Sequence, residues 1–190
     1  MPDIDPGIVI HEIKTYTNAK PVRQKLCPIH PCKVAAIKAE VDKLLKVGFI
    51  YPIPLTDSVS NIVPVMKKHG TTQVCVDYRY IIKACLKDNY PIPFIDQIID
   101  DCVGSEVFSF MDGFSCYNQI NILPVDQHKT AFIFLWGTFA YRKLPFGLKN
   151  VGVTFQRAMS TLFTTSNTLC NPILTTYRHT QIFAEIIRRI

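Results

Sequence analysis

Residues 108–120 read FSFMDGFSCYNQI, and they contain Asp112, a carboxylate that is a candidate metal ligand. Alternating apolar residues in SEVFSFMD (105–112) predict a strand that ends at Asp112. Gly113 and Ser115 then predict a turn. A carboxylate at a strand end beside a glycine-containing turn is a usual position for a ligand of a hard cation such as Mg²⁺. The alternative is that Asp112 only caps the helix that follows.

Downstream of this stretch, the apolar pattern predicts more strands and a helix. The strands are QINILP (119–124), TAFIFLW (130–136) and TFAYRKLP (138–145), with a turn at Gly137. A helix is predicted at 151–163, with one buried face made of Phe155, Met159, Leu162 and Phe163.

Upstream, helices and strands are again mixed. A helix is predicted at 33–47 and ends at Gly48. FIYPIP (49–54) is extended, and 61–67 with 73–78 form a hairpin around Gly70. A further helix is predicted within 90–103, past Pro93. Residues 1–32, which contain five prolines, are predicted to be an extended lead-in rather than a packed element. This mixed order favours an α+β fold.

Composition limits the classes of function. Hydrophobic residues make up 48% of the 190 residues, which is enough for a core. The net charge of +6 admits a polyanion such as nucleic acid as a partner, although many basic proteins bind no nucleic acid. The seven cysteines and the acidic start of the chain, which resembles no secretory signal, predict reduced thiols inside a cell and no disulfide-linked partner. The spacing of Cys27, His30 and Cys32 matches no common zinc pattern. No apolar run approaches the ~18 residues that span a bilayer, so no membrane contact is expected.

A series of motifs follows one collinear order along the chain. It comprises EVDKLLKVGFI (40–50), VPVMKKHG (63–70), CVDYR (75–79), KACLKDNYPIPFIDQIID (83–100), SFMDGFSCYNQI (109–120), DQHKTAFI (126–133), WGTFAYRKLPFGLKN (136–150) and TFQRAM (154–159). From about Lys20 to Phe163 the series resembles the reverse transcriptases of gypsy-type (Metaviridae) LTR retrotransposons, which are parts of Pol polyproteins. The resemblance implies a partial right-hand polymerase fold. Fingers and an incomplete palm are expected at 33–163, between the lead-in 1–32 and a divergent tail 164–190.

The resemblance also implies a chemistry, namely RNA-directed DNA polymerisation by nucleotidyl transfer at two Mg²⁺ ions ~4 Å apart. Asp112 matches the first of three catalytic, metal-binding carboxylates. The expected nucleotide contacts are Tyr117, Phe146, Gly147, Lys67 and Lys68, with Tyr117 as the steric gate against a 2′-hydroxyl. Gln156 and Arg157 are expected on the template side, and the expected partners are an RNA/DNA template–primer and a dNTP. The alternative for Tyr117 is a core tyrosine, and the alternative for Phe146 and Gly147 is a structural turn. For Lys67 and Lys68 the alternative is a solvated basic turn, and for Gln156 and Arg157 it is a solvated helix face. The expected location, cytoplasm or nucleus, follows from the family alone.

Several features of the family are missing or altered. Its other two carboxylates lie in a Tyr-x-Asp-Asp turn, yet residues 164–190 contain no aspartate, and Asp100-Asp101 precede the first motif. Gln73 stands where a basic residue is usual, Tyr80 and Ile82 where an acid and an asparagine are usual, and Cys116 where a glycine is usual. If that glycine has a positive φ, a Cβ at Cys116 strains the turn. The chain is therefore predicted to be a reverse transcriptase fragment that is inactive by itself. The alternative is a non-catalytic module that grips a template–primer duplex.

Overall fold

The computed structural model describes residues 3–66, 72–91, 94, 96, 100, 103 and 116–165. The predicted strand 105–112 with Asp112, the lysines Lys67 and Lys68, and the tail 166–190 lie outside the described residues. Most of the predicted helix within 90–103 also lies outside them, although Asp100 is helical and exposed, as expected for it.

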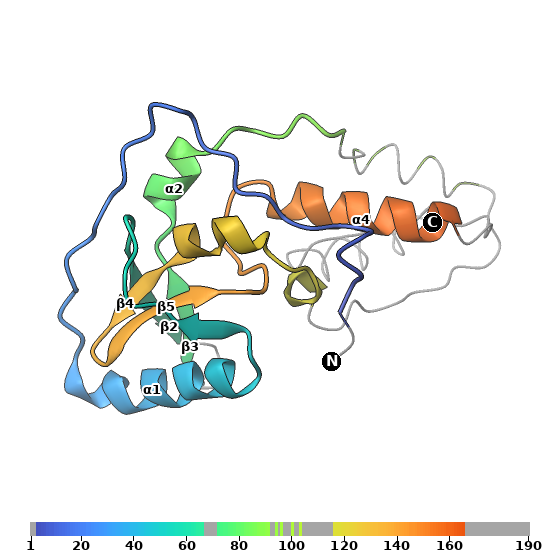
Figure 1. Cartoon of the computed structure of the whole chain (residues 1–190). Coiled ribbons are helices and arrows are strands. Elements are labelled where there is room, and N and C mark those ends of the chain that lie inside the picture. Colours follow the sequence, from blue (N-terminus) through green and yellow to red (C-terminus); the bar gives the residue numbers. More distant parts are fainter. Residues whose placement is uncertain are drawn as a thin grey trace.

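A five-stranded mixed sheet forms the centre of the fold (Figure 1). Its order is β1-β5-β4-β2-β3, and the strands are β1 (Ile50–Pro52), β2 (Ser60–Met66), β3 (Thr72–Val76), β4 (Phe132–Phe134) and β5 (Gly137–Tyr141). β2 and β4 are parallel, and the other neighbours are antiparallel. Together with the three α-helices and two 3₁₀ helices of the described part of the chain, this sheet confirms the α+β class.

The two predicted hairpins are present, one of them with a shifted turn. β2 and β3 pair from Ile62↔Val76 to Met66↔Thr72. Ile62 and Val74 are buried, whereas Val63 and Val65 are exposed, as the period of two requires. In the second hairpin Phe134 pairs with Gly137, so the turn is Leu135–Trp136 and the prediction of a turn at Gly137 is off by one position. Gly137 opens β5 at φ 150°, which explains why a glycine stands beside the turn.

Helix α1 (Pro31–Lys46) confirms the predicted helix at 33–47. It lies along the sheet (Figure 1) and buries Ile37 and Val41. Its end is a Schellman motif, because the Gly48 N–H donates to the Leu45 carbonyl and the Phe49 N–H to the Leu44 carbonyl, both at 3.0 Å. Gly48 has φ 77°, a conformation that glycine adopts without a steric penalty.

Helix α4 (Val151–Thr165) confirms the predicted helix at 151–163. Val151, Val153, Phe155 and Ala158 are buried, and Met159 and Leu162 are partly buried against the core. Between β3 and the undescribed residues lies the short helix α2 (Arg79–Ala84), none of whose residues is fully buried.

The strand predicted at 119–124 is wrong, although the burial pattern behind it is right. Ile120 and Ile122 are both 0% exposed with Asn121 between them, which is the alternation of a strand. However, this segment makes only the isolated bridges His11↔Ile122 and Asn121↔Lys143 and no ladder. It connects two 3₁₀ helices, η1 (Cys116–Gln119) and η2 (Pro124–Thr130), and Pro124 lacks the N–H that would extend a ladder.

The lead-in is extended as predicted, but the prediction that it is not packed is wrong. Ile4, Val9 and Ile13 belong to the hydrophobic core. Figure 1 shows the lead-in, in dark blue, running beside the start of α4 and then around the molecule to α1. Along its length, its backbone hydrogen-bonds to residues 119, 121, 84 and 59 in turn, so it is held by partners from three distant parts of the chain.

Candidate functional site

Three aromatic rings from three elements form the centre of the candidate site. The Tyr117 ring of η1 lies 5.2 Å, centroid to centroid, from Phe146, at an interplanar angle of 82°. On its other side it lies 5.2 Å from Phe155 of α4, at 73°. Such edge-to-face contacts contribute about 0.5–1.5 kcal/mol each beyond area burial. The structure therefore brings the predicted residues Tyr117 and Phe146 together.

The two rings differ in exposure. Tyr117 is only 4% exposed, whereas Phe146 is 45% exposed. Phe146 thus presents the apolar surface, and Tyr117 supports it from beneath, with Phe155 behind. The interpretation of Tyr117 as a core tyrosine fits this burial, and its predicted role as a steric gate stays a prediction.

Gly147 is held in a conformation that favours glycine, close to the ring of Tyr78. Its φ is 94°, and a Cβ there would lie 3.8 Å from Cδ2 of Tyr78. Tyr78 is buried, and its hydroxyl donates to the Thr130 carbonyl at 3.0 Å. Burial raises the pKa of Tyr78 well above its ordinary value, so the hydroxyl keeps its proton. The 145–150 loop, Pro145 to Asn150, therefore rests on a fixed aromatic base.

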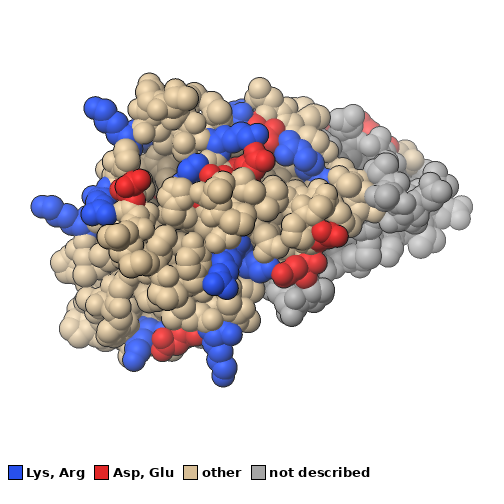
Figure 2. Space-filling view, viewed as in Figure 1, with Lys and Arg blue, Asp and Glu red and all other residues tan. Residues whose placement is uncertain are grey.

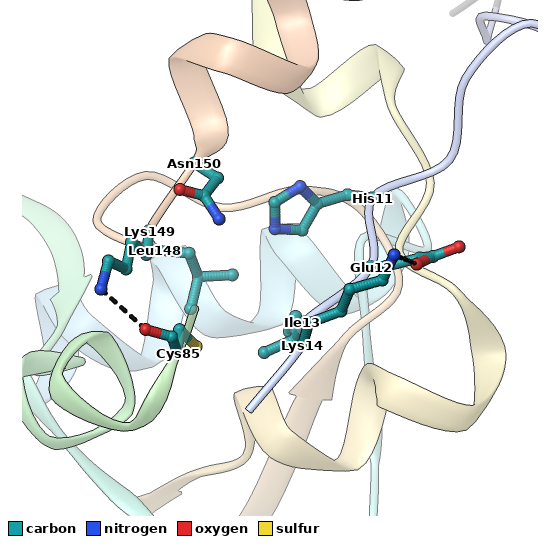
Figure 3. A pocket seen from close by; sticks show the side chains of 8 residues that line it. All are labelled: His11, Glu12, Ile13, Lys14, Cys85, Leu148, Lys149 and Asn150. Atoms are coloured by element: carbon teal, nitrogen blue, oxygen red, sulfur yellow. Dashed lines mark hydrogen bonds and ion pairs between the residues drawn. The ribbon is translucent and has the colours of Figure 1, made fainter. Parts of the chain in front are cut away.

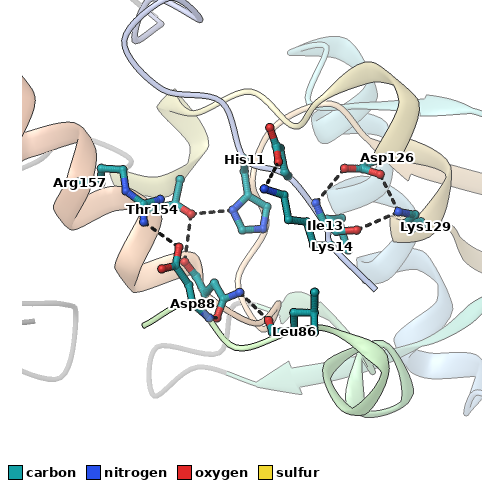
Figure 4. Close-up of polar contacts among 11 residues, drawn as sticks. His11, Ile13, Lys14, Leu86, Asp88, Asp126, Lys129, Thr154 and Arg157 are labelled. Carbon is teal, nitrogen blue, oxygen red and sulfur yellow. Dashed lines mark hydrogen bonds and ion pairs between the residues drawn. The ribbon is translucent and has the colours of Figure 1, made fainter. Parts of the chain in front are cut away.

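Gln156 and Arg157 of α4 differ in exposure, because Gln156 is buried whereas the side chain of Arg157 is 43% exposed and paired. Gln156 is only 8% exposed. Nη2 of Arg157 lies 2.8 Å from Oδ2 of Asp88 (Figure 4). The guanidinium also lies 4.9 Å from the centre of the Tyr90 ring. The hydrogen bond from Arg157 lowers the pKa of the Asp88 carboxyl. The template-side role of both residues stays a prediction.

An exposed cation that the motifs did not single out stands at the start of α2. Arg79 contacts both carboxylate oxygens of Asp77, with Nε at 2.8 Å and Nη2 at 2.7 Å. Its side chain is 81% exposed, so the pair lies at the surface. The only sequence signal was an acid and an arginine two residues apart within CVDYR.

The altered family positions have different surroundings. Tyr80 is 52% exposed and Ile82 is partly buried, so the apolar Ile82 packs where an amide is usual. Cys116 begins η1, and Asn150 is the one non-glycine with a positive φ among the residues that the structure describes. The strain considered for Cys116 therefore does not arise.

The structure leaves the predicted metal site untested, because Asp112 lies outside the described residues. Within the described ranges, no three His, Cys, Asp or Glu side chains are grouped so as to hold a metal ion. Nδ1 of His30 lies 2.8 Å from Sγ of Cys32, and both residues are exposed. Within the described part of the chain, Cys27, Cys32 and Cys85 form no disulfide.

Charges of both signs are interspersed on the face that Figure 2 shows. Within the described part of the chain several charged side chains are paired, including Lys14 with Glu12 at 2.8 Å and Lys129 with Asp126 at 2.6 Å. The net charge of +6 is therefore not gathered into one patch on this face. No helix in the described part of the chain is both long and apolar enough to cross a membrane.

Comparisons with known proteins agree with these motifs. The family described as "Reverse transcriptase (RNA-dependent DNA polymerase)" matches residues 65–181, so the match continues beyond Phe163, where the motifs end. The Tf2-3 and Tf2-4 transposon polyproteins of Schizosaccharomyces pombe are each 33% identical over 138 residues, which is 71% of this chain and 10% of each polyprotein. The chain thus spans about a tenth of the length of these relatives.

Solved structures share the fold. The native prototype foamy virus protease-reverse transcriptase has a TM-score of 0.68 at 21% identity, covering 95% of this chain and 25% of that one. The foamy viral protease-reverse transcriptase in complex with an RNA/DNA hybrid has a TM-score of 0.66 at 18% identity, covering 92% of this chain and 25% of that one. From its family match and its identity to the transposon polyproteins, the chain belongs to the reverse transcriptase (RNA-dependent DNA polymerase) family.

Proposed function

We propose that the chain is the fingers and front palm of a gypsy-type reverse transcriptase, encoded within a retrotransposon Pol polyprotein. The observation that carries this proposal is the meeting of Tyr117, Phe146 and Phe155, which come from three motifs of one collinear series. The identity to the Tf2 polyproteins supports the gypsy-type assignment.

In this proposal the exposed ring of Phe146 is the floor against which the sugar and base of a dNTP lie. Tyr117 supports that ring and limits the room at the 2′ position. Phe146 offers 45% of its surface, while its neighbours in the cluster are nearly fully buried. Lys67 and Lys68, on the link between β2 and β3, would supply point charges for phosphates.

The same proposal holds that this chain by itself performs no polymerisation. The family uses three carboxylates for its divalent cations, and Asp112 is the one position that matches. Residues 164–190 contain no aspartate, and the carboxylates at 100 and 101 precede the first motif. The ligands in this sequence do not fit a pair of Mg²⁺ ions, so we derive no catalytic step through them.

Primer extension on poly(rA)/oligo(dT) with Mg²⁺ or Mn²⁺ tests this proposal. We expect no extension, because electrostatic stabilisation at the metal ions supplies most of the rate in such transfers. The matched control is Asp112→Ala. Extension by the unchanged chain that disappears in this variant would contradict the proposal.

A second function is duplex binding without chemistry. It is favoured by the shared fold with foamy viral enzymes solved with double-stranded DNA and with an RNA/DNA hybrid. Fluorescence anisotropy against a labelled RNA–DNA hybrid tests it. A steep fall of affinity with salt supports phosphate contacts, at about 0.9 in the log–log slope for each contact. An absence of binding at concentrations up to about 10 µM would contradict this function.

A further inference from the structure

The residue before α4 has an unusual backbone and an unusual side-chain role. Asn150 has φ 64°, in the left-handed region that non-glycine residues rarely adopt. Its carbonyl accepts the Thr154 N–H at 2.9 Å, the first hydrogen bond of the helix. Its side chain does not cap the helix but reaches across to residues 85–90, Cys85 to Tyr90, which we name the connector because they lead away from α2.

The side-chain amide of Asn150 pairs with the connector as a neighbouring strand would. Nδ2 donates to the Leu86 carbonyl at 2.9 Å, and Oδ1 accepts the Asp88 N–H at 3.1 Å. One planar group thus satisfies a backbone acceptor and a backbone donor two residues apart. A side-chain amide offers both functions in one plane at neutral pH, whereas a carboxylate only accepts.

Neighbouring residues tie the same two segments together. Nζ of Lys149 donates to the Cys85 carbonyl at 2.7 Å, as the dashed line in Figure 3 shows. Arg157 binds the carboxylate of Asp88, and the Tyr90 hydroxyl contacts Oγ of Ser160 at 3.2 Å. In Figure 4 Leu86 and Asp88 lie on the connector, facing the first turns of α4. The connector is therefore held at four points by residues 149–160.

These contacts fix one end of the 145–150 loop, whose other end is held separately. The Leu144 N–H donates to the Ile120 carbonyl at 2.9 Å, just before the loop. Gly147 rests against Tyr78 in the middle. Without the Asn150 amide, the part of the loop that follows Gly147 would be held by the hydrogen bond from Lys149 and by the packing of Leu148 in the core. We propose that Asn150 is a positioning residue, whose amide anchors the 145–150 loop to the connector and so sets the place of Phe146 above Tyr117.

The importance of Phe146 for a nucleotide rests on the proposed function, but the anchoring does not. For that reason the test needs neither nucleotide nor template, and its failure is distinct from a failure of the primer-extension or duplex-binding experiments. A simpler explanation is that asparagine is present only because it tolerates φ 64°.

Asn150→Gly separates the two explanations in the full chain, because glycine adopts the same φ and removes only the amide. We expect about a tenfold loss of hydrogen-exchange protection at the Asp88 amide, as two hydrogen bonds are lost. The NMR cross-relaxation between the Tyr117 and Phe146 rings should weaken as well. Unchanged protection and an unchanged ring contact would overturn the proposal.

Asn61 offers a matched control, because it makes the same pairing elsewhere. Its Nδ2 donates to the Lys25 carbonyl at 2.6 Å, and its Oδ1 accepts the Cys27 N–H at 3.3 Å. Asn61→Ala should lower protection at Cys27 and leave both the Asp88 amide and the Tyr117–Phe146 contact unchanged. An equal effect of the control at Asp88 would mean general loosening and would also overturn the proposal.

Asn150→Asp adds a dependence on pH that would not arise if the residue only had to tolerate its backbone conformation. An ionised carboxylate accepts from Asp88 but cannot donate to Leu86, whereas a protonated carboxyl can do both. The Tyr117–Phe146 ring contact, relative to the unchanged chain at each pH, should therefore be weakened at neutral pH and recover as the pH falls below about 4, while the Asp88 amide keeps an acceptor throughout. If the glycine variant does not fold, this recovery decides alone, and its absence contradicts the proposal.

Discussion

The lead-in and the β2–β3 hairpin are both extended, yet they are held in opposite ways. The hairpin pairs residues that are near in sequence, and its outer face leaves Val63 and Val65 exposed. The lead-in forms no strand, but it buries Ile4, Val9 and Ile13 against partners more than a hundred residues away. The comparison teaches that regular secondary structure and contribution to stability are separate properties in this chain.

The backbone N–H and carbonyl of Ile13 illustrate how the lead-in is held. Its N–H donates to Oδ2 of Asp126, and its carbonyl accepts from Nζ of Lys129, both at 2.8 Å. Asp126 and Lys129 also pair with each other at 2.6 Å (Figure 4). Two oppositely charged side chains of η2 thus bind both backbone polar groups of one residue of the lead-in.

The largest effect is expected from Asp126→Ala. It leaves the Ile13 N–H without its acceptor and removes the carboxylate that pairs with the largely buried Lys129, which should lower the free energy of unfolding by about 3 kcal/mol. Urea denaturation followed by circular dichroism measures it. The control is Glu40→Ala, which breaks a 3.7 Å ion pair with an exposed lysine and should change stability by less than about 0.5 kcal/mol. Equal effects of the two variants would contradict the role given to the lead-in.

Acid should weaken the lead-in through His11. Burial lowers the pKa of His11 from 6.5 to about 4, so the unfolded chain binds this proton more tightly than the folded one. Stability is therefore complete above about pH 6.5 and is lost as the pH falls towards 4, by up to about 3 kcal/mol. Nδ1 of His11 lies 2.8 Å from Oγ of Thr154. Since the Thr154 hydroxyl donates its own proton to the Asn150 carbonyl, the ring nitrogen of His11 is the donor to this hydroxyl oxygen.

Urea midpoints between pH 7 and pH 4 measure this dependence. His11→Gln should remove most of the slope between pH 6.5 and 4 while the carboxylates of the chain still titrate. A slope that is the same in both proteins would show that another group carries the acid sensitivity.

The smallest effect is expected on the outer face of the hairpin. Val63→Thr keeps a β-branched side chain at a position that is 46% exposed, so stability should change by less than about 0.5 kcal/mol. The same substitution at Val9, which is 7% exposed, should cost more than about 1 kcal/mol. Thermal melting of both variants checks the difference, and a larger loss at Val63 would reverse the comparison.

The sequence predicted elements whose signals are local. The apolar stripe and Gly48 located α1, alternation located the β2–β3 hairpin, and the spacing of Phe155 and Met159 located α4. The packing of the lead-in could not be predicted in this way, because its prolines indicate an extended chain but not the partners that bury Ile13. For 119–124 the alternation predicted the buried side correctly, but pairing depends on segments distant in sequence.

The candidate site divides similarly. The motifs identified Tyr117, Phe146 and Gly147, and the structure brings them together on the base formed by Tyr78. They did not indicate that Arg157 is engaged by Asp88 and Tyr90, since those partners lie nearly seventy residues away. Asn150 gave a weak signal, as an asparagine just before a helix is ordinarily interpreted as a cap.

We propose that the chain keeps an aromatic surface for a nucleotide, formed by Phe146 on Tyr117, but lacks the full set of carboxylates that would bind two cations. Electron paramagnetic resonance of Mn²⁺, added with template–primer and dNTP to the full chain and to Asp112→Ala, tests it most directly. We expect the same spectrum from both proteins, with no pair of spin-coupled ions. A coupled Mn²⁺ pair in the unchanged chain that vanishes in the variant would contradict the account.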